Sequence, residues 1–412
     1  MLRRSHPVPA TRAAALFLLA LGIACSLLLQ STSGAAQLPQ RSASKTVTSA
    51  TSAQKNPKRK PASIKKANKK PTKAKALKRR TAESQTAKPQ PYDGSSAAMQ
   101  AADAIAKAQR LDRQWVRSVM AQAQMLPAVV RAVTPPAQPG SRNWAAYRER
   151  VMTPQRIALG AAFLREHAAT LARAEAQYGV PPAIVAGILG IETIYGRNMG
   201  NFRVLDALAT LALDFPDSHP KKAQRQAYFL TELEAYFAFC HSGGYDPLSL
   251  RGSYAGAMGM GQFMPSSWLQ YAVDFDGSGR IDLFNSPDDA IGSVAHYLSV
   301  FQWKRGMATH YPVAAGTLPA DLQALLEPDI VPSFSPQQLE AKGLVLDPAA
   351  RSHPGLLALV ALPMGESGPP HYVLGTDNFF TITRYNWSSQ YALAVIELAQ
   401  AIEAAAQLPA QP

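Results

Sequence analysis

The distribution of charge divides this 412-residue chain into a part that cannot fold alone and a part that can. Residues 1–80 contain 18 of the 42 Lys and Arg residues and no Asp or Glu. The other 24 basic residues accompany all 28 acidic residues in 81–412, so this second part has a formal net charge of −4. Because a nucleic-acid-binding domain is normally basic, we expect no nucleic-acid partner for the folded part.

The first 36 residues have the composition of an export signal or membrane anchor. Three arginines among the first twelve residues precede an apolar run at 13–29, as in the n-region and h-region of a signal. The run is slightly short for a membrane span. We predict an exported protein of the cell envelope. Cleavage near 33–36, retention of 13–29 as an anchor and lipidation at Cys25 stay open as alternatives.

Residues 37–96 are rich in Ser, Thr, Ala, Pro and Lys and predict a disordered linker. A flexible chain of this length spans on the order of 40 Å, and charge repulsion extends it further. Behind an export signal, such a basic segment would attract anionic envelope polymers or lipid headgroups. A simple spacer is the equally open alternative.

Cysteine usage agrees with this division, since the only two cysteines are Cys25, within the signal, and Cys240. The folded part therefore has one thiol and no internal disulfide. Cys240 follows an aromatic run and is predicted to be a small buried residue.

From residue 97 the pattern is helical to about residue 303, which predicts an α+β fold that is predominantly α. Asp112 is the expected N-cap between two helices in 97–131, and Thr153 is the expected N-cap of the next helix. Gly196 is expected to end the helix that begins at Pro182 in a left-handed conformation. The other helices are predicted at 154–178, 205–213, 221–241 and 388–405.

The sequence after residue 305 changes to short apolar segments separated by Gly and Pro. These segments predict a small β element at about 350–387. We expect its strands at 356–362, 371–374 and 379–384, with a turn at 375–378.

One carboxylate occurs on an apolar helix. Ile184, Ile188, Ile191 and Tyr195 recur at helical spacing, and Glu192 falls on or beside their stripe. Burial would raise the pKa of this carboxyl group and retain its proton near neutral pH. A retained proton is what the general acid in glycosidic-bond cleavage needs. The structural alternative is a boundary residue whose head reaches water.

Residues 252–268 combine glycines at 256, 259 and 261 with hydrogen-bonding and flat apolar side chains. The glycines allow close approach of the backbone to a ligand or to another helix. Ser253 and Gln262 offer hydroxyl and amide groups, and Phe263 and Trp268 offer aromatic surface, as in a sugar subsite. The segment lacks the lysine and spacing of a phosphate loop. A glycine-rich helix junction is the structural alternative.

An acidic loop follows at 274–282. It has oxygen-bearing side chains at alternate positions, Gly at its sixth position and an apolar residue at its eighth, like an EF-hand calcium loop. Its twelfth position is Asn285 instead of Glu, so it is not a standard EF-hand. A solvated acidic turn is the alternative.

Three segments together resemble the motifs of the lytic murein transglycosylase B family. They are Ile-Leu-Gly-Ile-Glu-Thr-x-Tyr-Gly-Arg at 188–197, Val-Leu-Asp-Ala-Leu-Ala-Thr-Leu at 204–211, and Gly-Ser-Tyr-Ala-Gly-Ala-Met-Gly-x-Gly-Gln-Phe-Met-Pro-Ser-Ser at 252–267. The resemblance is collinear from about residue 100 to 402. It implies a catalytic domain at 97–408 with a lysozyme-like core at about 155–305.

The resemblance also implies an activity. Enzymes of this family cleave the β-1,4 bond between N-acetylmuramic acid and N-acetylglucosamine in peptidoglycan, without water, and leave a 1,6-anhydro end. Glu192 matches the family's catalytic glutamate, acting first as acid and then as base. Two alternatives stay open: a muramidase-type hydrolase with a second acid such as Asp206, and a non-catalytic peptidoglycan-binding scaffold. We expect a periplasmic monomer whose partner is the glycan strand.

Further site residues are carried over by the same resemblance. Gln224 stands where the family has an arginine, which puts contacts with the stem peptide in doubt. Calcium would be structural, with no organic cofactor, and Asp289 is favoured over Asp288 as its closing ligand. The implied substrate-binding residues are Ser253, Gln262, Tyr147, Tyr297, Tyr385, Tyr391 and Arg225, and the implied calcium ligands are Asp274, Asp276, Ser278, Arg280 (through its carbonyl) and Asp289.

Overall fold

The computed structural model describes residues 89–136, 142–313, 318–319 and 321–407. The predicted export signal and residues 37–88 of the predicted linker lie outside this part of the chain. The buried apolar residues form one large cluster, to which most of the helices contribute, and a smaller cluster in the C-terminal region. No helix of the described residues has the length and apolar character that crossing a membrane would need.

The structure confirms the predicted break at Asp112, but residues 97–131 contain parts of three helices where two were expected, because the second ends at Ala121 and another begins at Pro127. Helices α2 (Ser96–Gln109) and α3 (Arg113–Ala121) are separated at Asp112, whose side chain accepts a hydrogen bond from the Trp115 N–H at 2.7 Å. This contact satisfies a backbone donor at the start of α3, so the N-cap prediction is confirmed. A short antiparallel pair, β1 (Gln90–Pro91) with β2 (Gln124–Met125), precedes helix α4 (Pro127–Val133).

The single helix expected at 154–178 is two helices. Helix α5 (Trp144–Val151) precedes α6 (Pro154–Glu166), where Thr153 is the N-cap as predicted. At His167 the backbone leaves the helical region, with φ −106° and ψ 24°, and α7 (Ala168–Tyr178) begins after it. The prediction of one continuous helix was therefore wrong.

Helix α8 (Pro182–Thr193) is buried nearly all round, from Ala183 to Gly190 and again at Glu192 and Thr193. The expectation of a single apolar stripe was too narrow, because neighbouring helices cover almost the whole helix. Gly187 permits one of these contacts, since a Cβ there would lie 2.8 Å from the Val395 carbonyl oxygen of α17 (Ser389–Gln407). The left-handed C-cap is Ile194, with φ 54°, and not Gly196.

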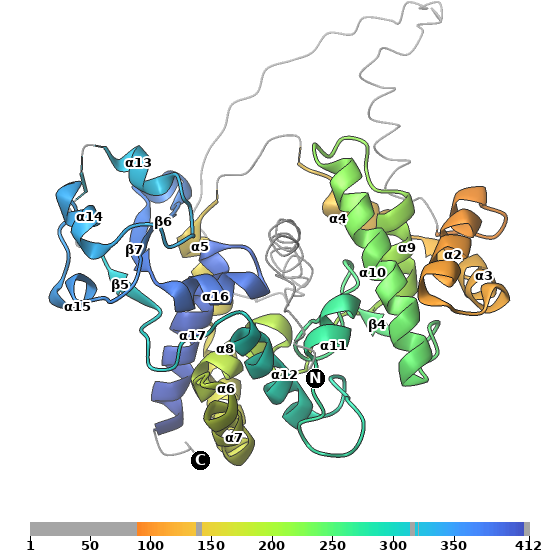
Figure 1. Ribbon diagram of the computed structural model, residues 1–412, viewed down its shortest axis with the longest axis horizontal. Coiled ribbons are helices and arrows are strands. Elements are labelled where there is room, and N and C mark those ends of the chain that lie inside the picture. The colour runs from red at the N-terminus through yellow and green to blue at the C-terminus, as the bar shows by residue number, and fades with distance from the viewer. Residues whose placement is uncertain (1–88, 137–141, 314–317, 320, 408–412) are drawn as a thin grey trace, which may run out of the picture. The chain divides into compact units, whose positions relative to one another are not determined.

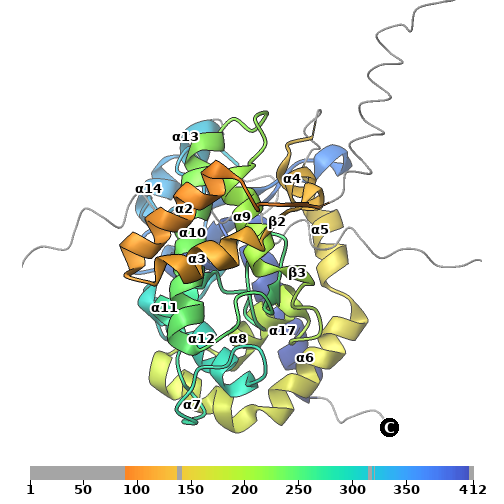
Figure 2. The same cartoon turned by 90° about the vertical axis from the view of Figure 1, so that its right-hand side faces the viewer.

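The helices pack in two groups, which both views show. Helices α6, α7, α8, α12 (Pro287–Val300) and α17 gather in one group, and α2 and α3 pack with α9 (Val204–Leu213) and α10 (Lys222–Gly243) in another (Figures 1 and 2). The antiparallel pair β3 (Phe202–Arg203) and β4 (Arg251–Gly252) and helix α11 (Pro265–Tyr271) adjoin α9 and α10. Cys240 on α10 is buried, as predicted.

The C-terminal β element is a three-stranded antiparallel sheet in the order β5 (His310–Pro312), β7 (His371–Gly375), β6 (Ala358–Leu362). Two predicted strands are confirmed, but the third, at 379–384, is helix α16 (Asp377–Tyr385). The expected turn at 375–378 is the junction between β7 and α16, where Thr376 is the N-cap. Short helices surround the sheet: α13 (Leu322–Leu326), α14 (Pro336–Ala341), α15 (Pro348–Arg351) and a 3₁₀ turn at Gly365–Ser367.

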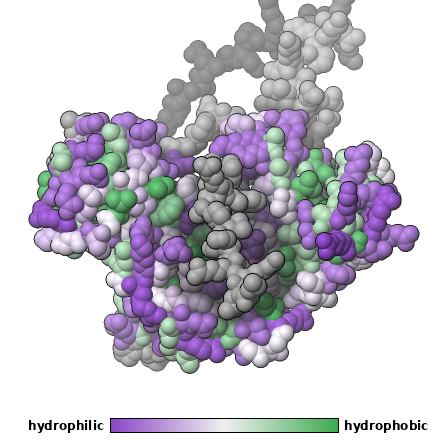
Figure 3. All heavy atoms as spheres, viewed as in Figure 1, coloured by the Kyte–Doolittle hydropathy of each residue, from purple (hydrophilic) through white to green (hydrophobic). Residues whose placement is uncertain are grey.

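The visible surface in Figure 3 is mainly hydrophilic, with hydrophobic residues in small separate patches. The apolar side chains are instead concentrated in the two buried clusters. This distribution is the one expected when helices bury their apolar faces against each other.

Candidate active site

Glu192 lies in the last turn of α8, and its side chain is withdrawn from bulk water. Only 8% of the residue is exposed. Its Oε1 accepts a hydrogen bond of 2.7 Å from the hydroxyl of Tyr391 on α17. The packing of α8 against α17 thus brings together two predicted site residues that are 199 positions apart. The enclosed position disagrees with the alternative of a boundary residue whose head reaches water.

The end of α8 is tied to the glycine-rich segment, which we define as residues 252–264. The Thr193 hydroxyl donates to the Met260 carbonyl oxygen at 2.7 Å and accepts from the Gly196 N–H at 2.9 Å. Thr193 is fully buried. Because Thr193 directly follows Glu192, its bond to Met260 fixes the backbone beside the carboxylate relative to the segment, and its bond from Gly196 closes the turn after α8.

Gln262 adopts an unusual backbone conformation in that segment. Its φ is +50°, in the left-handed region that favours glycine. Its amide Nε2 donates to the carbonyl oxygens of Met199 and Gly259, each at 3.1 Å. Strained non-glycine backbone of this kind is concentrated at functional sites. The side chain is half-buried, and its contact with glycan stays a prediction.

Ser253 is fully enclosed in this structure. Its Oγ accepts hydrogen bonds from the N–H groups of Ala255, at 3.3 Å, and Ala257, at 3.0 Å. These bonds close the turn at the start of the glycine-rich segment. The position gives Ser253 a role in shaping the segment, and its direct contact with glycan stays a prediction.

Two predicted tyrosines pack together against the glycine-rich segment. Tyr385 on α16 donates its hydroxyl to the Gly261 carbonyl oxygen, and Tyr297 on α12 donates to the Arg384 carbonyl oxygen at 2.7 Å. Their ring centroids are 4.9 Å apart, and each lies 5.9 Å from the ring of Phe263. The fold therefore brings Tyr297 and Tyr385 together at the part of the segment that bears Gln262.

The last two predicted residues lie on other helices. Tyr147 on α5 is buried and stacks on Trp144, with ring centroids 6.2 Å apart. Arg225 on α10 is also buried, and desolvation lowers the pKa of its guanidinium group. Tyr228 and Tyr254 oppose this decrease in pKa electrostatically.

Tyr228 is a further candidate site residue, which none of the sequence motifs indicated. It is one turn after Arg225 on α10, and both Arg225 and Tyr297 act electrostatically on its hydroxyl group. Burial is the main cause that raises the pKa of Tyr228. The spacing of Arg225, Tyr228 and Glu232 at i, i+3 and i+7 puts all three on one face of a helix, which could have identified this row from the sequence.

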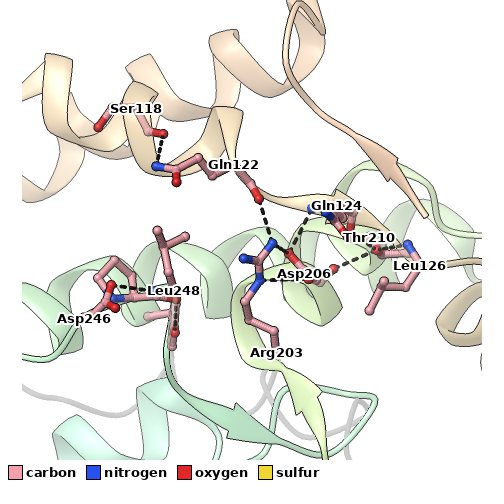
Figure 4. A network of polar contacts seen from close by, with 11 residues as sticks. Ser118, Gln122, Gln124, Leu126, Arg203, Asp206, Thr210, Asp246 and Leu248 are labelled. Atoms are coloured by element: carbon pink, nitrogen blue, oxygen red, sulfur yellow. Dashed lines mark hydrogen bonds and ion pairs between the residues drawn. The ribbon is translucent and has the colours of Figure 1, made fainter.

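Asp206, the possible second acid of a hydrolase, instead takes part in hydrogen bonds that hold the fold together. Its Oδ1 accepts from the Gln124 N–H at 2.9 Å and from Arg203 Nη2 at 2.6 Å, and its Oδ2 accepts from Arg203 Nε at 2.9 Å (Figure 4). Thr210 on the same helix accepts from the Leu126 N–H at 3.0 Å. These contacts join α9 to the β2 segment and argue against Asp206 as a partner of Glu192 in hydrolysis.

The acidic loop gathers three carboxylates that fit a calcium ion. One oxygen each from Asp274, Asp276 and Asp289 lies within 4.8 Å of the other two. A set of oxygen ligands is the kind that calcium prefers. Asp289 is fully buried, whereas Asp274 and Asp276 are exposed. Hydrogen bonds from Ser278 lower the pKa of Asp276, so this carboxyl group is ionised at neutral pH.

The neighbouring acids Asp288 and Asp289 point to different partners. Asp289 accepts from the N–H groups of Phe275 at 2.7 Å, Asp276 at 3.1 Å and Asp282 at 2.8 Å. Asp288 accepts instead from the Thr170 hydroxyl of α7 at 2.9 Å. This arrangement supports the choice of Asp289 as the closing ligand. Ser278 donates its hydroxyl to the Arg280 carbonyl oxygen at 3.0 Å, so both remaining predicted ligands also lie in the loop.

Comparison with known proteins agrees with this fold. Residues 94–400 match the family model described as the transglycosylase SLT domain. The chain is 40% identical over 314 residues to the membrane-bound lytic murein transglycosylase B of Escherichia coli (strain K12), covering 74% of this chain and 82% of that protein.

Two solved structures of the Escherichia coli lytic transglycosylase SLT35 are similar to this one. The complex with bulgecin A is 40% identical with a TM-score of 0.65, and the complex with calcium is 39% identical with a TM-score of 0.64. Each comparison covers 75% of this chain and 93% of the other. The likeness confirms the predicted fold class, which is predominantly α with a lysozyme-like core. By the extent of the family match and the identity to these relatives, the chain belongs to the transglycosylase SLT domain family.

Proposed function

We propose that Glu192 is the acid and then the base of a lytic murein transglycosylase that cleaves the glycan strands of peptidoglycan. The name of the Escherichia coli relative supports the activity. The complex of SLT35 with bulgecin A supports the binding of a ligand by this fold. The assignment to Glu192 rests on the geometry of the site.

The observation that carries the proposal is a difference in the hydrogen-bond and ion-pair partners of the buried carboxylates in the described residues. They are Glu192, Asp206, Glu232 and Asp289. Asp206 forms an ion pair with Arg203, Asp289 accepts three backbone N–H groups, and Glu232 accepts from Ser266. Glu192 accepts from the phenol of Tyr391, a partner that can orient either protonation state of the carboxyl group. Glu232 also accepts from a hydroxyl, that of Ser266, but its other oxygen accepts the Ser266 N–H at the start of α11.

A single carboxyl group is sufficient for the reaction. Protonated Glu192 would donate its proton to the glycosidic oxygen, so that the bond from C1 of N-acetylmuramic acid to this oxygen breaks and N-acetylglucosamine leaves with a free hydroxyl. The substrate's own N-acetyl group would stabilise the positive charge at C1. The Glu192 carboxylate would then remove the proton of the C6 hydroxyl, whose oxygen bonds to C1. The ring closes without water, and Glu192 regains its proton.

The other predicted residues would hold the glycan. We assign sugar contact to Gln262, Tyr297 and Tyr385, which meet at one end of the glycine-rich segment. Ser253 would shape that segment, while Tyr147 and Arg225 would extend the site along α5 and α10. Aromatic rings and amides are suited to this task because sugars present both apolar faces and hydroxyl groups.

Calcium would stabilise the loop that joins α11 to α12. The cluster of Asp274, Asp276 and Asp289 supports this assignment, as does the calcium complex of SLT35. Calcium supplies charge neutralisation between these carboxylates, and no step of the reaction requires it. We further propose an exported monomer whose basic linker contacts anionic polymers or lipids of the envelope.

The decisive experiment is analysis of the reaction products. Purified peptidoglycan sacculi are digested with the full-length protein, and the fragments are identified by mass spectrometry. We expect fragments with a 1,6-anhydro end, 18 mass units (one water) lighter than hydrolysis products. Fragments with a reducing end would show a muramidase, and the absence of any fragment would favour a binding scaffold.

Tyr391→Phe should reduce kcat about 10- to 100-fold and leave the sacculus-binding affinity unchanged. The substitution removes the hydroxyl that donates to Glu192, and such a hydrogen bond to a charged group is worth about 1.5–3 kcal/mol. Initial rates and a sedimentation binding assay measure the two quantities. Tyr236→Phe is the matched control, since the Tyr236 hydroxyl is also buried but donates to the Pro247 carbonyl oxygen. Equal rates for both variants would contradict the assignment.

A further inference from the structure

Glu232 is a buried carboxylate that the proposed reaction does not use. It lies on α10 and is 3% exposed. Its Oε2 accepts from the Ser266 N–H at 3.0 Å, and its Oε1 accepts from the Ser266 hydroxyl at 2.6 Å. Ser266 is in the first turn of α11, so Glu232 caps the N-terminus of this helix from a different helix.

Helix α11 begins directly after the glycine-rich segment. Met264 is its N-cap and has no side-chain cap of its own, and Pro265 is its first residue. The two bonds from Ser266 to Glu232 therefore anchor the end of the segment that bears Gln262 and Phe263. Without them, this end would be held to α10 by apolar packing, which is less directional than a bond to a charged group.

The same carboxylate also lies beside the hydroxyl of Tyr228, one helical turn earlier on α10. Tyr228 is in turn under the electrostatic influence of Arg225 and Tyr297, two predicted glycan-binding residues. Burial raises the pKa of Glu232, and its contacts with Ser266 and Tyr228 oppose this increase. Three donors around one carboxyl group favour its ionised form, which can accept all of them.

We propose that Glu232 is a positioning residue that holds Tyr228 on α10 and the glycine-rich segment in the relative placement that glycan binding requires. This inference rests on the proposed function. The carboxylate reaches both sides at once: its bonds to Ser266 fix the segment, and its contact with Tyr228 fixes the phenol near Arg225 and Tyr297. Glu232 contacts no substrate in this scheme and transfers no proton.

The test is Glu232→Gln in the full-length protein, with rates measured over a range of sacculus concentrations. Glutamine keeps the shape but replaces one acceptor by a donor, so one of the three neighbouring donors loses its partner. We expect the apparent KM to rise about tenfold, with kcat within about twofold of the wild-type value. Glu234→Gln is the matched control, because Glu234 on the same helix accepts from Gln109 at the surface. It should leave both constants unchanged.

A double-mutant cycle separates positioning from general stability. If Glu232 acts through Tyr228, the variant that combines Glu232→Gln with Tyr228→Phe should have an apparent KM no higher than the worse single variant. Independent, multiplying effects on KM would overturn the proposal, as would a folded Glu232→Gln with the wild-type KM. Circular dichroism melting curves verify that each variant is folded.

Ser266→Ala covers the case in which Glu232→Gln does not fold. This variant removes one donor and keeps the carboxylate, and we expect the apparent KM to rise about threefold. An unchanged KM in Ser266→Ala would overturn the inference. Failure of the proposed function is visible separately, because the wild-type protein would then release reducing ends or no fragments at all.

Discussion

Glu192→Gln should reduce the release of anhydro fragments from sacculi by about 10²–10⁴-fold, the range that general acid–base catalysis contributes. Glutamine has nearly the same shape, so Tyr391 can still donate to its side-chain oxygen. However, the amide can neither give up a proton to the glycosidic oxygen nor accept one from the C6 hydroxyl. Because both halves of the proposed reaction depend on this group, no other described contact would replace it.

Binding provides the second measurement for this variant. The sedimentation of Glu192→Gln with sacculi should match that of the wild-type protein, since the proposed glycan contacts come from other residues. Glu166→Gln is the control, because Glu166 is exposed at the end of α6. Turnover at the wild-type rate in folded Glu192→Gln would refute the catalytic assignment.

Asp289→Ala should lower the free energy of unfolding by about 3–5 kcal/mol, even without calcium. The variant leaves the N–H groups of Phe275, Asp276 and Asp282 without the carboxylate that now accepts from them, and a buried unsatisfied polar group costs about 1–3 kcal/mol. For a domain of this size, the expected decrease in Tm is roughly 5–10 °C. Differential scanning calorimetry measures it.

The effect of calcium on Tm distinguishes metal binding from the stability that the hydrogen bonds to Asp289 contribute. Addition of calcium should raise the Tm of the wild-type protein, because a ligand that binds only the folded state stabilises it, and a chelator should reverse the increase. The Asp289→Ala variant should not respond to either. Asp288→Ala should keep the calcium response, because Asp288 accepts from Thr170 outside the carboxylate cluster. A calcium response that Asp288→Ala loses and Asp289→Ala keeps would reverse the ligand assignment.

Local signals in the sequence were sufficient for most helix boundaries. Asp112 and Thr153 are N-caps as predicted, since a cap depends on a donor only a few residues away. The prediction failed at 379–384, where Phe, Ile and Thr favour a strand by intrinsic preference. There Thr376 caps a helix, and Phe379 and Ile382 are buried in the large core. Tertiary packing therefore decided the conformation of this segment.

The sequence by itself determined which residue types this protein brings to its site. A carboxylate on an apolar helix, a glycine-rich segment with Gln262 and an acidic loop are all local patterns, and together with the family motifs they make Glu192 the candidate acid. Only the tertiary structure decided which partners meet. Tyr391 is 199 positions from Glu192, and Asp206 turned out to be engaged by Arg203. The physical reason is that residue spacing fixes geometry within one helix or turn, whereas contacts between elements depend on how the helices pack.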